Sequence, residues 1–173
     1  MKISEVDVTV FAWDDIPVAR YGQANPATSS RGEIGLLRIA TDEGLEGYAF
    51  LGSSFRSVKL DVTSLVRHLK PVVMGRDPLE RERLHADLLV RTRATTLRAI
   101  GAVDVALWDL CGKIAGLPLY KMLGAYRSRV AAYASSSTLA NKAAYVESVL
   151  AMKAAGFRAY KIHPPSGDLA ECI

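Results

Sequence analysis

Hydrophobic and polar positions alternate with a period of two through the first fifty residues, which is typical of β-strands. One such run covers residues 2–13, and two more surround Asp42-Glu43-Gly44, a sequence typical of a hairpin turn. The β-branched side chains on one face of the first run are Ile3, Val6, Val8 and Val10. Residues 14–32 and 51–56 are predicted to be loops, because Gly, Pro, Ser and Asn are frequent there. The pattern therefore predicts a three-stranded antiparallel sheet.

From residue 58 onward the hydrophobic period lengthens to 3.6, which predicts three helices. Pro71 is predicted to end the first helix, and Asp77 with Pro78 to begin the second as N-cap and first residue. Gly116 is predicted to end the third helix. The apolar positions along the three helices are Val58, Val62, Leu65, Val66 and Leu69; Leu84, Leu88 and Leu89; and Ile100, Val103, Leu107, Leu110 and Ile114. Residues 1–125 are therefore predicted to form one α+β unit.

After the third helix, a strand, a helix and a second strand are predicted to follow one another. Residues 130–135 form the first strand, and Asn141 is the predicted N-cap of a helix that Gly156 ends. Residues 159–163, Ala-Tyr-Lys-Ile-His, form the second strand, which is predicted to be buried. Such a β-α-β unit implies two parallel strands and a right-handed crossover.

Composition excludes several classes of protein. The chain has 173 residues and a net charge of +4. Its first residues lack the apolar core of a signal peptide, and no apolar run is long enough to cross a bilayer, so we expect a soluble, cytoplasmic protein. The two cysteines, Cys111 and Cys172, have no metal-ligand spacing, and Cys111 is predicted to be a small core residue.

Arginine supplies much of the positive charge between residues 80 and 98. The charged residues are Arg81, Arg83, Arg91, Arg93 and Arg98, with Glu80, Glu82 and Asp87 among them. This mixture predicts a helix side with internal ion pairs. A nucleic-acid partner is not expected, because no recognition motif accompanies the arginines.

A lysine and a histidine lie two residues apart at the end of the last predicted strand. Because side chains alternate along a strand, Lys161 and His163 share one face, where an unpaired buried lysine would be costly. Both side chains suit the C-terminal mouth of a β/α barrel, where active sites of this architecture lie. Two nitrogen bases this close disfavour each other's protonated forms, which suits proton transfer. The alternative is a lysine that reaches solvent beside a satisfied polar histidine.

The segment AIGAVDVALWDLCGKIAGLPLYKMLG, residues 99–124, closely resembles the helix signature of the mandelate racemase and muconate lactonizing branch of the enolase superfamily. We interpret most of it as packing residues. Gly101, Ala102 and Ala106 are expected to allow close approach of a helix, Trp108 to fill the core, and Asp104 and Asp109 to anchor turns.

The resemblance implies an architecture for the whole chain. Residues 1–125 would be an α+β capping domain, a three-stranded antiparallel sheet plus helices. Residues 126–173 would be the first β-α-β unit of a (β/α) TIM-like barrel, which needs about 250 residues when complete. Two loops of the cap would contact the substrate, one at Arg20 and Tyr21 and the other at Ser53, Ser54 and Phe55. The resemblance also implies a homo-oligomer for the full-length form.

The resemblance implies a reaction as well. Lys161 would lie near the substrate carboxylate, and His163 would hold the place of the base that removes the α proton, or would orient the substrate. Mg²⁺ would stabilise the ene-diolate, but its carboxylate ligands in the family come from later strands, and Asp168 and Glu171 are poor substitutes. No metal ligand is therefore predicted in this chain, and the chain alone is predicted to be inactive.

The sequence leaves three functions open. A sugar-acid dehydratase is preferred, because the Lys-Ile-His motif and a polar loop suit a small, hydroxylated carboxylate substrate. A racemase or epimerase of the same superfamily is the second choice. A non-catalytic capping or binding module is the alternative from another class, since a lone β-α-β unit leaves strand edges and apolar helix faces uncovered.

Overall fold

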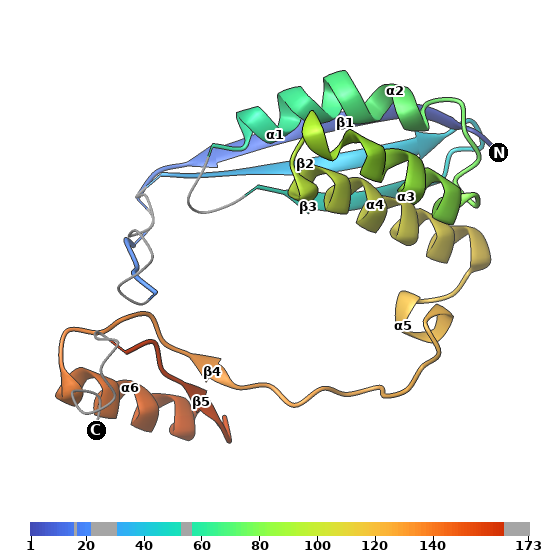
Figure 1. The fold of residues 1–173 in the computed structure, drawn as a ribbon. Coiled ribbons are helices and arrows are strands. Elements are labelled where there is room, and N and C mark those ends of the chain that lie inside the picture. The colour runs from blue at the N-terminus through green and yellow to red at the C-terminus, as the bar shows by residue number, and fades with distance from the viewer. Residues whose placement is uncertain (16, 22–30, 53–56, 165–173) are drawn as a thin grey trace. The chain divides into compact units, whose positions relative to one another are not determined.

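The computed structural model describes residues 1–15, 17–21, 31–52 and 57–164 (Figure 1). The chain divides into two compact units. The first consists of Met1–Asp14 and Arg31–Tyr126, and the second of Asp15–Ser30 and Arg127–Ile173. No helix in the described part of the chain is both long and apolar enough to cross a membrane.

The first unit contains the predicted antiparallel sheet, with strand order β1-β2-β3. Its strands are β1 (Ile3–Trp13), β2 (Gly32–Thr41) and β3 (Glu46–Leu51). The hairpin turn lies where the sequence predicts it. Gly44 takes a φ of 84°, which favours glycine, and its N–H donates to the Thr41 carbonyl at 3.1 Å, which closes the turn. The three-stranded sheet is therefore confirmed.

A β-bulge explains why Ile3 and Val6, which are an odd number of residues apart, face the same side. The pairing of β1 with β2 shifts register between Ile3 and Glu5. Both Ile3 and Val6 are 1% exposed and belong to the hydrophobic core.

The helices of the first unit are α1 (Lys59–Ser64), the π-helix η1 (Leu65–Leu69), α2 (Lys70–Val73), α3 (Arg81–Leu89), the 3₁₀ helix η2 (Val90–Arg93), α4 (Leu97–Ala115) and α5 (Leu119–Met122). Helices α1 to α4 lie over one face of the sheet (Figure 1), whereas α5 follows α4 and has no buried residue. Leu65, Leu84 and Leu107, three of the apolar residues predicted for the helix faces, are fully buried. The prediction is wrong for Val66 and Leu89, which are 47% and 41% exposed. The last turn of α4 ends at Gly116, which takes a φ of 63°, as predicted.

Two predicted helix boundaries are wrong. The first helix does not end at Pro71 but continues through η1 and α2 to Val73, and Pro71 lies at the start of α2, directly after the π-helical turn. Asp77 does not cap the second helix, which begins at Arg81. Its carboxylate instead accepts a hydrogen bond from the Leu79 N–H at 2.9 Å, within the turn before α3.

The signature helix α4 uses its residues differently from several of the predictions. Gly101 is exposed, and a Cβ atom added to it would meet nothing within 4 Å, so it does not serve close packing. Trp108 is only half-buried, and the Arg81 guanidinium carbon lies 3.8 Å from its ring centre. Ala102 and Ala106 are buried, as expected.

The two aspartates of α4 do not anchor turns. Asp109 accepts a hydrogen bond from the Tyr48 N–H at 2.9 Å and forms an ion pair with Lys113 at 2.7 Å, which joins α4 to β3. Asp104 pairs with Arg81 at 3.3 Å and so joins α4 to α3. The correction has a simple reason: both side chains lie in the middle of a long helix, next to neighbouring elements rather than next to a turn.

Within the arginine-rich segment, Arg81 forms the predicted kind of ion pair, with Glu82, whereas Arg98 pairs with a carboxylate outside the segment. Arg98 donates to the Asp61 carboxylate at 2.7 Å, and Asp61 is only 1% exposed. Cys111 is buried at 3% exposed, and its thiol donates to the Pro78 carbonyl at 3.4 Å, in agreement with its predicted core position.

The second unit contains the predicted β-α-β order: β4 (Ala134–Ser135), α6 (Lys142–Ala154) and β5 (Tyr160–Lys161). The two strands are parallel, and the Asn141 side chain caps α6 by accepting the Ala144 N–H at 3.0 Å. Both strands are shorter than predicted. The prediction that the second one is buried is wrong, because Lys161 and Ile162 are exposed and no second layer covers them among the described residues.

Candidate active site

The candidate site lies at the carboxyl end of β5. Lys161 is the last residue of this strand and pairs with Ser135 of β4. Its carbonyl accepts the Ser136 N–H at 3.0 Å, while its side chain is exposed. The parallel pairing therefore brings the end of β4 beside the Lys-Ile-His segment.

His163 is held by hydrogen bonds at three of its atoms. Its backbone N–H donates to the Ser136 hydroxyl at 3.2 Å, and its ring Nδ1 lies 2.5 Å from the Ser136 carbonyl oxygen. Its own carbonyl accepts the Tyr145 hydroxyl at 2.6 Å. Ser136 is buried, at 6% exposed, so both of its oxygens meet His163 away from bulk water.

Of the predicted substrate-contacting residues, the structure brings Tyr21 to His163. Their ring centres are 5.1 Å apart at an interplanar angle of 76°, an edge-to-face contact. The neighbouring Arg20 carbonyl accepts the Thr138 N–H at 2.6 Å, which fixes this segment beside the loop after β4. The Arg20 side chain is exposed. All of these contacts lie within the second unit.

The other predicted loop, Ser53, Ser54 and Phe55, lies outside the described residues, as do Asp168, Glu171 and Cys172. Within the described ranges, no group of three His, Cys, Asp or Glu side chains could hold a metal ion. The described residues therefore do not fit a magnesium site.

Two residues that contact His163, Ser136 and Tyr145, were not among the predicted site residues. The helical period places Tyr145 only on a helix face, and Ser136 lies in an unremarkable Ser-Ser-Ser-Thr run at 135–138. The expected parallel pairing could have pointed to Ser136, because the residue just after one strand lies beside the end of its parallel neighbour.

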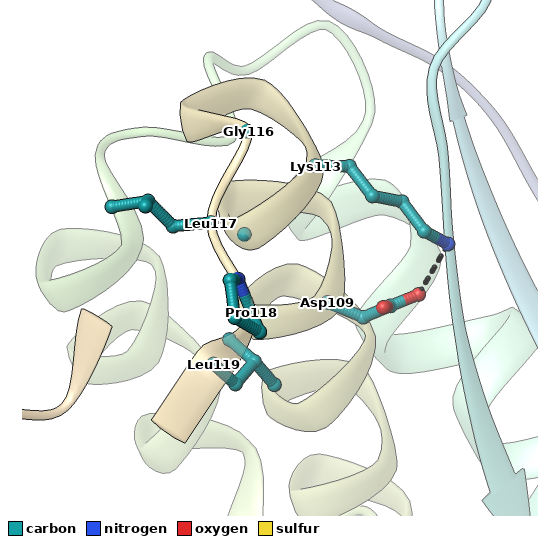
Figure 2. A pocket seen from close by; sticks show the side chains of 7 residues that line it. Asp109, Lys113, Gly116, Leu117, Pro118 and Leu119 are labelled. Atoms are coloured by element: carbon teal, nitrogen blue, oxygen red, sulfur yellow. Dashed lines mark hydrogen bonds and ion pairs between the residues drawn. The ribbon is translucent and has the colours of Figure 1, made fainter. Parts of the chain in front are cut away.

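A separate hollow of about 350 Å³ lies at the C-terminal end of α4 (Figure 2). It is lined by Asp109, Gly112, Lys113, Gly116, Leu117, Pro118 and Leu119. Figure 2 shows Lys113 reaching Asp109, and the Lys113 ammonium also donates to the Glu46 carbonyl at 2.8 Å. The hollow lies between the last turns of α4 and the segment that follows the helix, and its two charged side chains already bind one another.

The structure has the architecture that the sequence predicts. It consists of an α+β unit with a three-stranded antiparallel sheet, followed along the chain by a parallel β-α-β unit. A family model described as the N-terminal domain of mandelate racemase / muconate lactonizing enzyme matches residues 7–124. The chain belongs to this family, and the resemblance to the enolase superfamily is confirmed. The first unit is accordingly an enolase-type capping domain.

Similar proteins carry the likeness beyond the cap. A D-galactonate dehydratase family member from Streptomyces bingchenggensis is 38% identical over 107 residues, which is 58% of this chain and 26% of that protein. The structure of D-glucarate dehydratase from Agrobacterium tumefaciens, complexed with magnesium, is 28% identical with a TM-score of 0.76 and covers 96% of this chain and 46% of that one.

A third similar structure is a racemase from Streptomyces coelicolor with bound magnesium. It is 26% identical, has a TM-score of 0.80, and covers 92% of this chain and 46% of that one. The chain thus spans about a quarter of the length of the curated relative and less than half the length of both solved structures.

Proposed function

We propose that the protein represented by this chain is an enolase-superfamily enzyme that removes the proton α to a carboxylate, with dehydration of a sugar acid as the outcome. The observation that carries the proposal is the position of Lys161 and His163 at the carboxyl end of a parallel strand, with Tyr21 against the His163 ring. The dehydratases among the similar proteins support this choice. We keep residues 1–125 as the proposed cap and 126–173 as the proposed start of the barrel.

The site residues have separate proposed roles. Lys161, whose side chain is exposed, places a positive charge where a substrate carboxylate can bind, and this favours the charge that develops on that carboxylate. His163 accepts the α proton as a general base. Tyr21 and Arg20 contact the substrate from the adjacent segment, and Ser53, Ser54 and Phe55 do so from the other predicted loop.

Magnesium is part of the proposal because two similar structures contain it. When bound, the ion would supply stabilisation of the ene-diolate. Its ligands are not among the described residues of this chain. A small-molecule carboxylate is the proposed substrate, and a homo-oligomer in the cytoplasm is the proposed form of the enzyme.

The test is an activity screen of the protein as its native source produces it, with Mg²⁺ and a panel of sugar acids. We expect turnover, and a loss of about 10²–10⁴-fold in kcat for Lys161→Ala and His163→Ala. Lys153→Ala, which removes an exposed lysine of α6, is the matched control and should retain activity. Full activity in His163→Ala would assign the base to another residue.

A racemase or epimerase is the second candidate, since one of the similar structures is a racemase. Exchange of the substrate α proton for solvent deuterium, with return of both stereoisomers and no loss of water, would favour it over dehydration. The absence of both turnover and exchange with every acid tested would favour the third alternative, a non-catalytic binding module.

A further inference from the structure

The hydrogen bonds around His163 determine which of its two ring nitrogens carries the proton. The Ser136 carbonyl oxygen can only accept a hydrogen bond. Its 2.5 Å contact with Nδ1 therefore requires a proton on Nδ1. A neutral imidazole carries a single ring proton, so the lone pair of neutral His163 lies on Nε2.

This arrangement reverses the preference of a histidine side chain in water, where the neutral ring favours the proton on Nε2. The cost of reversing it is offset by a contact that is sheltered from solvent, since Ser136 is 6% exposed. The site thus has a built-in bias for one tautomer.

Two side chains bind the backbone on either side of this contact. The Ser136 hydroxyl accepts the His163 backbone N–H at 3.2 Å, so Ser136 forms hydrogen bonds with both the backbone and the ring of His163. The Tyr145 hydroxyl donates to the His163 carbonyl at 2.6 Å and accepts the Leu139 N–H at 2.9 Å. From α6, Tyr145 therefore ties the loop after β4 to the end of β5.

We propose that Ser136 and Tyr145 are positioning residues that hold His163 as its Nδ1–H tautomer and present Nε2 as the nitrogen that accepts a proton. The role of Nε2 in proton transfer rests on the proposed function. The tautomer and the two residues that select it rest only on the geometry of the second unit.

The experiment is a two-bond ¹H–¹⁵N correlation spectrum of the chain labelled with ¹⁵N-histidine, recorded at a pH where His163 is neutral. His68 and His85 are the other two histidines, and the His163→Gln spectrum assigns the third signal. We expect the nitrogen shifts of the Nδ1–H form for His163 in the wild type. An Nε2–H form in the wild type would overturn the proposal without any variant being needed.

Two variants test the positioning residues. Tyr145→Phe removes the hydroxyl that bridges Leu139 and His163, and Ser136→Ala removes the hydroxyl but keeps the carbonyl. Each should shift the tautomer ratio toward Nε2–H by up to about fivefold, the equivalent of one typical hydrogen bond, because the Ser136 carbonyl is then held less firmly against Nδ1. Tyr160→Phe is the matched control. It removes a hydroxyl that binds Ser148 of α6, the helix that also carries Tyr145, at 2.6 Å, and this hydrogen bond does not involve His163.

The outcomes separate this proposal from the function. A tautomer ratio that is the same in Tyr145→Phe and Ser136→Ala as in Tyr160→Phe would overturn the positioning role. If Tyr145→Phe fails to fold, Ser136→Ala and the wild-type spectrum still decide. An Nδ1–H signal for this chain, together with no turnover of any acid by the protein as its native source produces it, would support the tautomer and contradict the proposed function.

Discussion

Gly47 of β3 lies directly against the carbonyl oxygen of Ala106 in α4, so close that a Cβ atom on residue 47 would stand 2.1 Å from that oxygen. The same Cβ would lie 2.9 Å from the Leu110 Cβ. Helix α4 therefore rests on the backbone of β3. The close approach in the cap depends on a glycine of the sheet, whereas the glycine predicted for this role was Gly101 of the helix.

Replacement of this glycine should destabilise the cap strongly. We expect Gly47→Ala to lower the free energy of unfolding by about 3 kcal/mol, because backbone atoms of α4 would have to move away. Gly101→Ala is the control, since position 101 is helical and nothing lies within 4 Å of an added Cβ. It should raise stability by about 0.5–1 kcal/mol. Urea unfolding of both variants measures the difference, and equal effects would contradict the close contact.

The buried carboxylate of Asp61, in α1, should be costly to remove because it binds two residues at the start of α4. It accepts hydrogen bonds from the Thr96 hydroxyl and from Arg98, both at 2.7 Å. Asp61→Ala should cost about 2–3 kcal/mol, since it leaves Arg98 without its partner in a partly buried place. A double-mutant cycle with Arg98→Ala measures the coupling.

The control for this prediction is Asp14→Ala. Asp14 is 74% exposed and pairs with Arg31 at 3.7 Å, so its loss should change stability by less than about 0.5 kcal/mol. A zero coupling energy between Asp61 and Arg98 would show that the ion pair contributes nothing to the stability of α4.

Acid should weaken the cap partly through Glu46. The Tyr48 hydroxyl and the Arg38 guanidinium hold the pKa of this carboxyl below its usual value of 4.5. Because the folded pKa is lowered, the stabilisation is fully present above pH 4.5 and is lost as the pH falls through the folded pKa. Tyr48→Phe should therefore flatten the decline in stability below pH 4.5. Thermal unfolding at a series of pH values measures this, and Tyr133→Phe, in the other unit, should leave the curve unchanged.

The thiol of Cys111 should be unreactive in the folded protein. Burial raises the pKa of this thiol above its usual 9.0, so the thiol stays neutral in the folded protein. The unfolded chain, whose thiol is not shielded, ionises more readily, so stability is lost as the pH rises above 9.0. In a Cys172→Ser background, Cys111 is the remaining cysteine of the sequence. We expect it to react with an aromatic disulfide reagent at least about 100-fold more slowly than in urea. Equal rates in both conditions would contradict a buried thiol.

Most of the cap could be predicted from sequence because its elements depend on local periodicity. The alternation in residues 2–13 and the 3.6-residue repeat of α4 are carried by neighbouring residues and required no knowledge of the fold. The predictions for Pro71 and Asp77 were wrong because a proline or a cap residue fits more than one place in a helical segment. The surrounding packing decides which place it takes.

For the candidate site, the sequence by itself determined that Lys161 and His163 lie two residues apart at the end of a strand. Their spacing along the backbone follows from the chain alone. Only the tertiary structure decided their surroundings. Ser136 and Tyr145, which form hydrogen bonds with His163, lie 27 and 18 positions before it in the sequence. Tyr21, which contacts the same ring, lies near the N-terminus. Such contacts form when α6 brings the two parallel strands together, and no local pattern records which hydroxyl or carbonyl will then lie within hydrogen-bond distance.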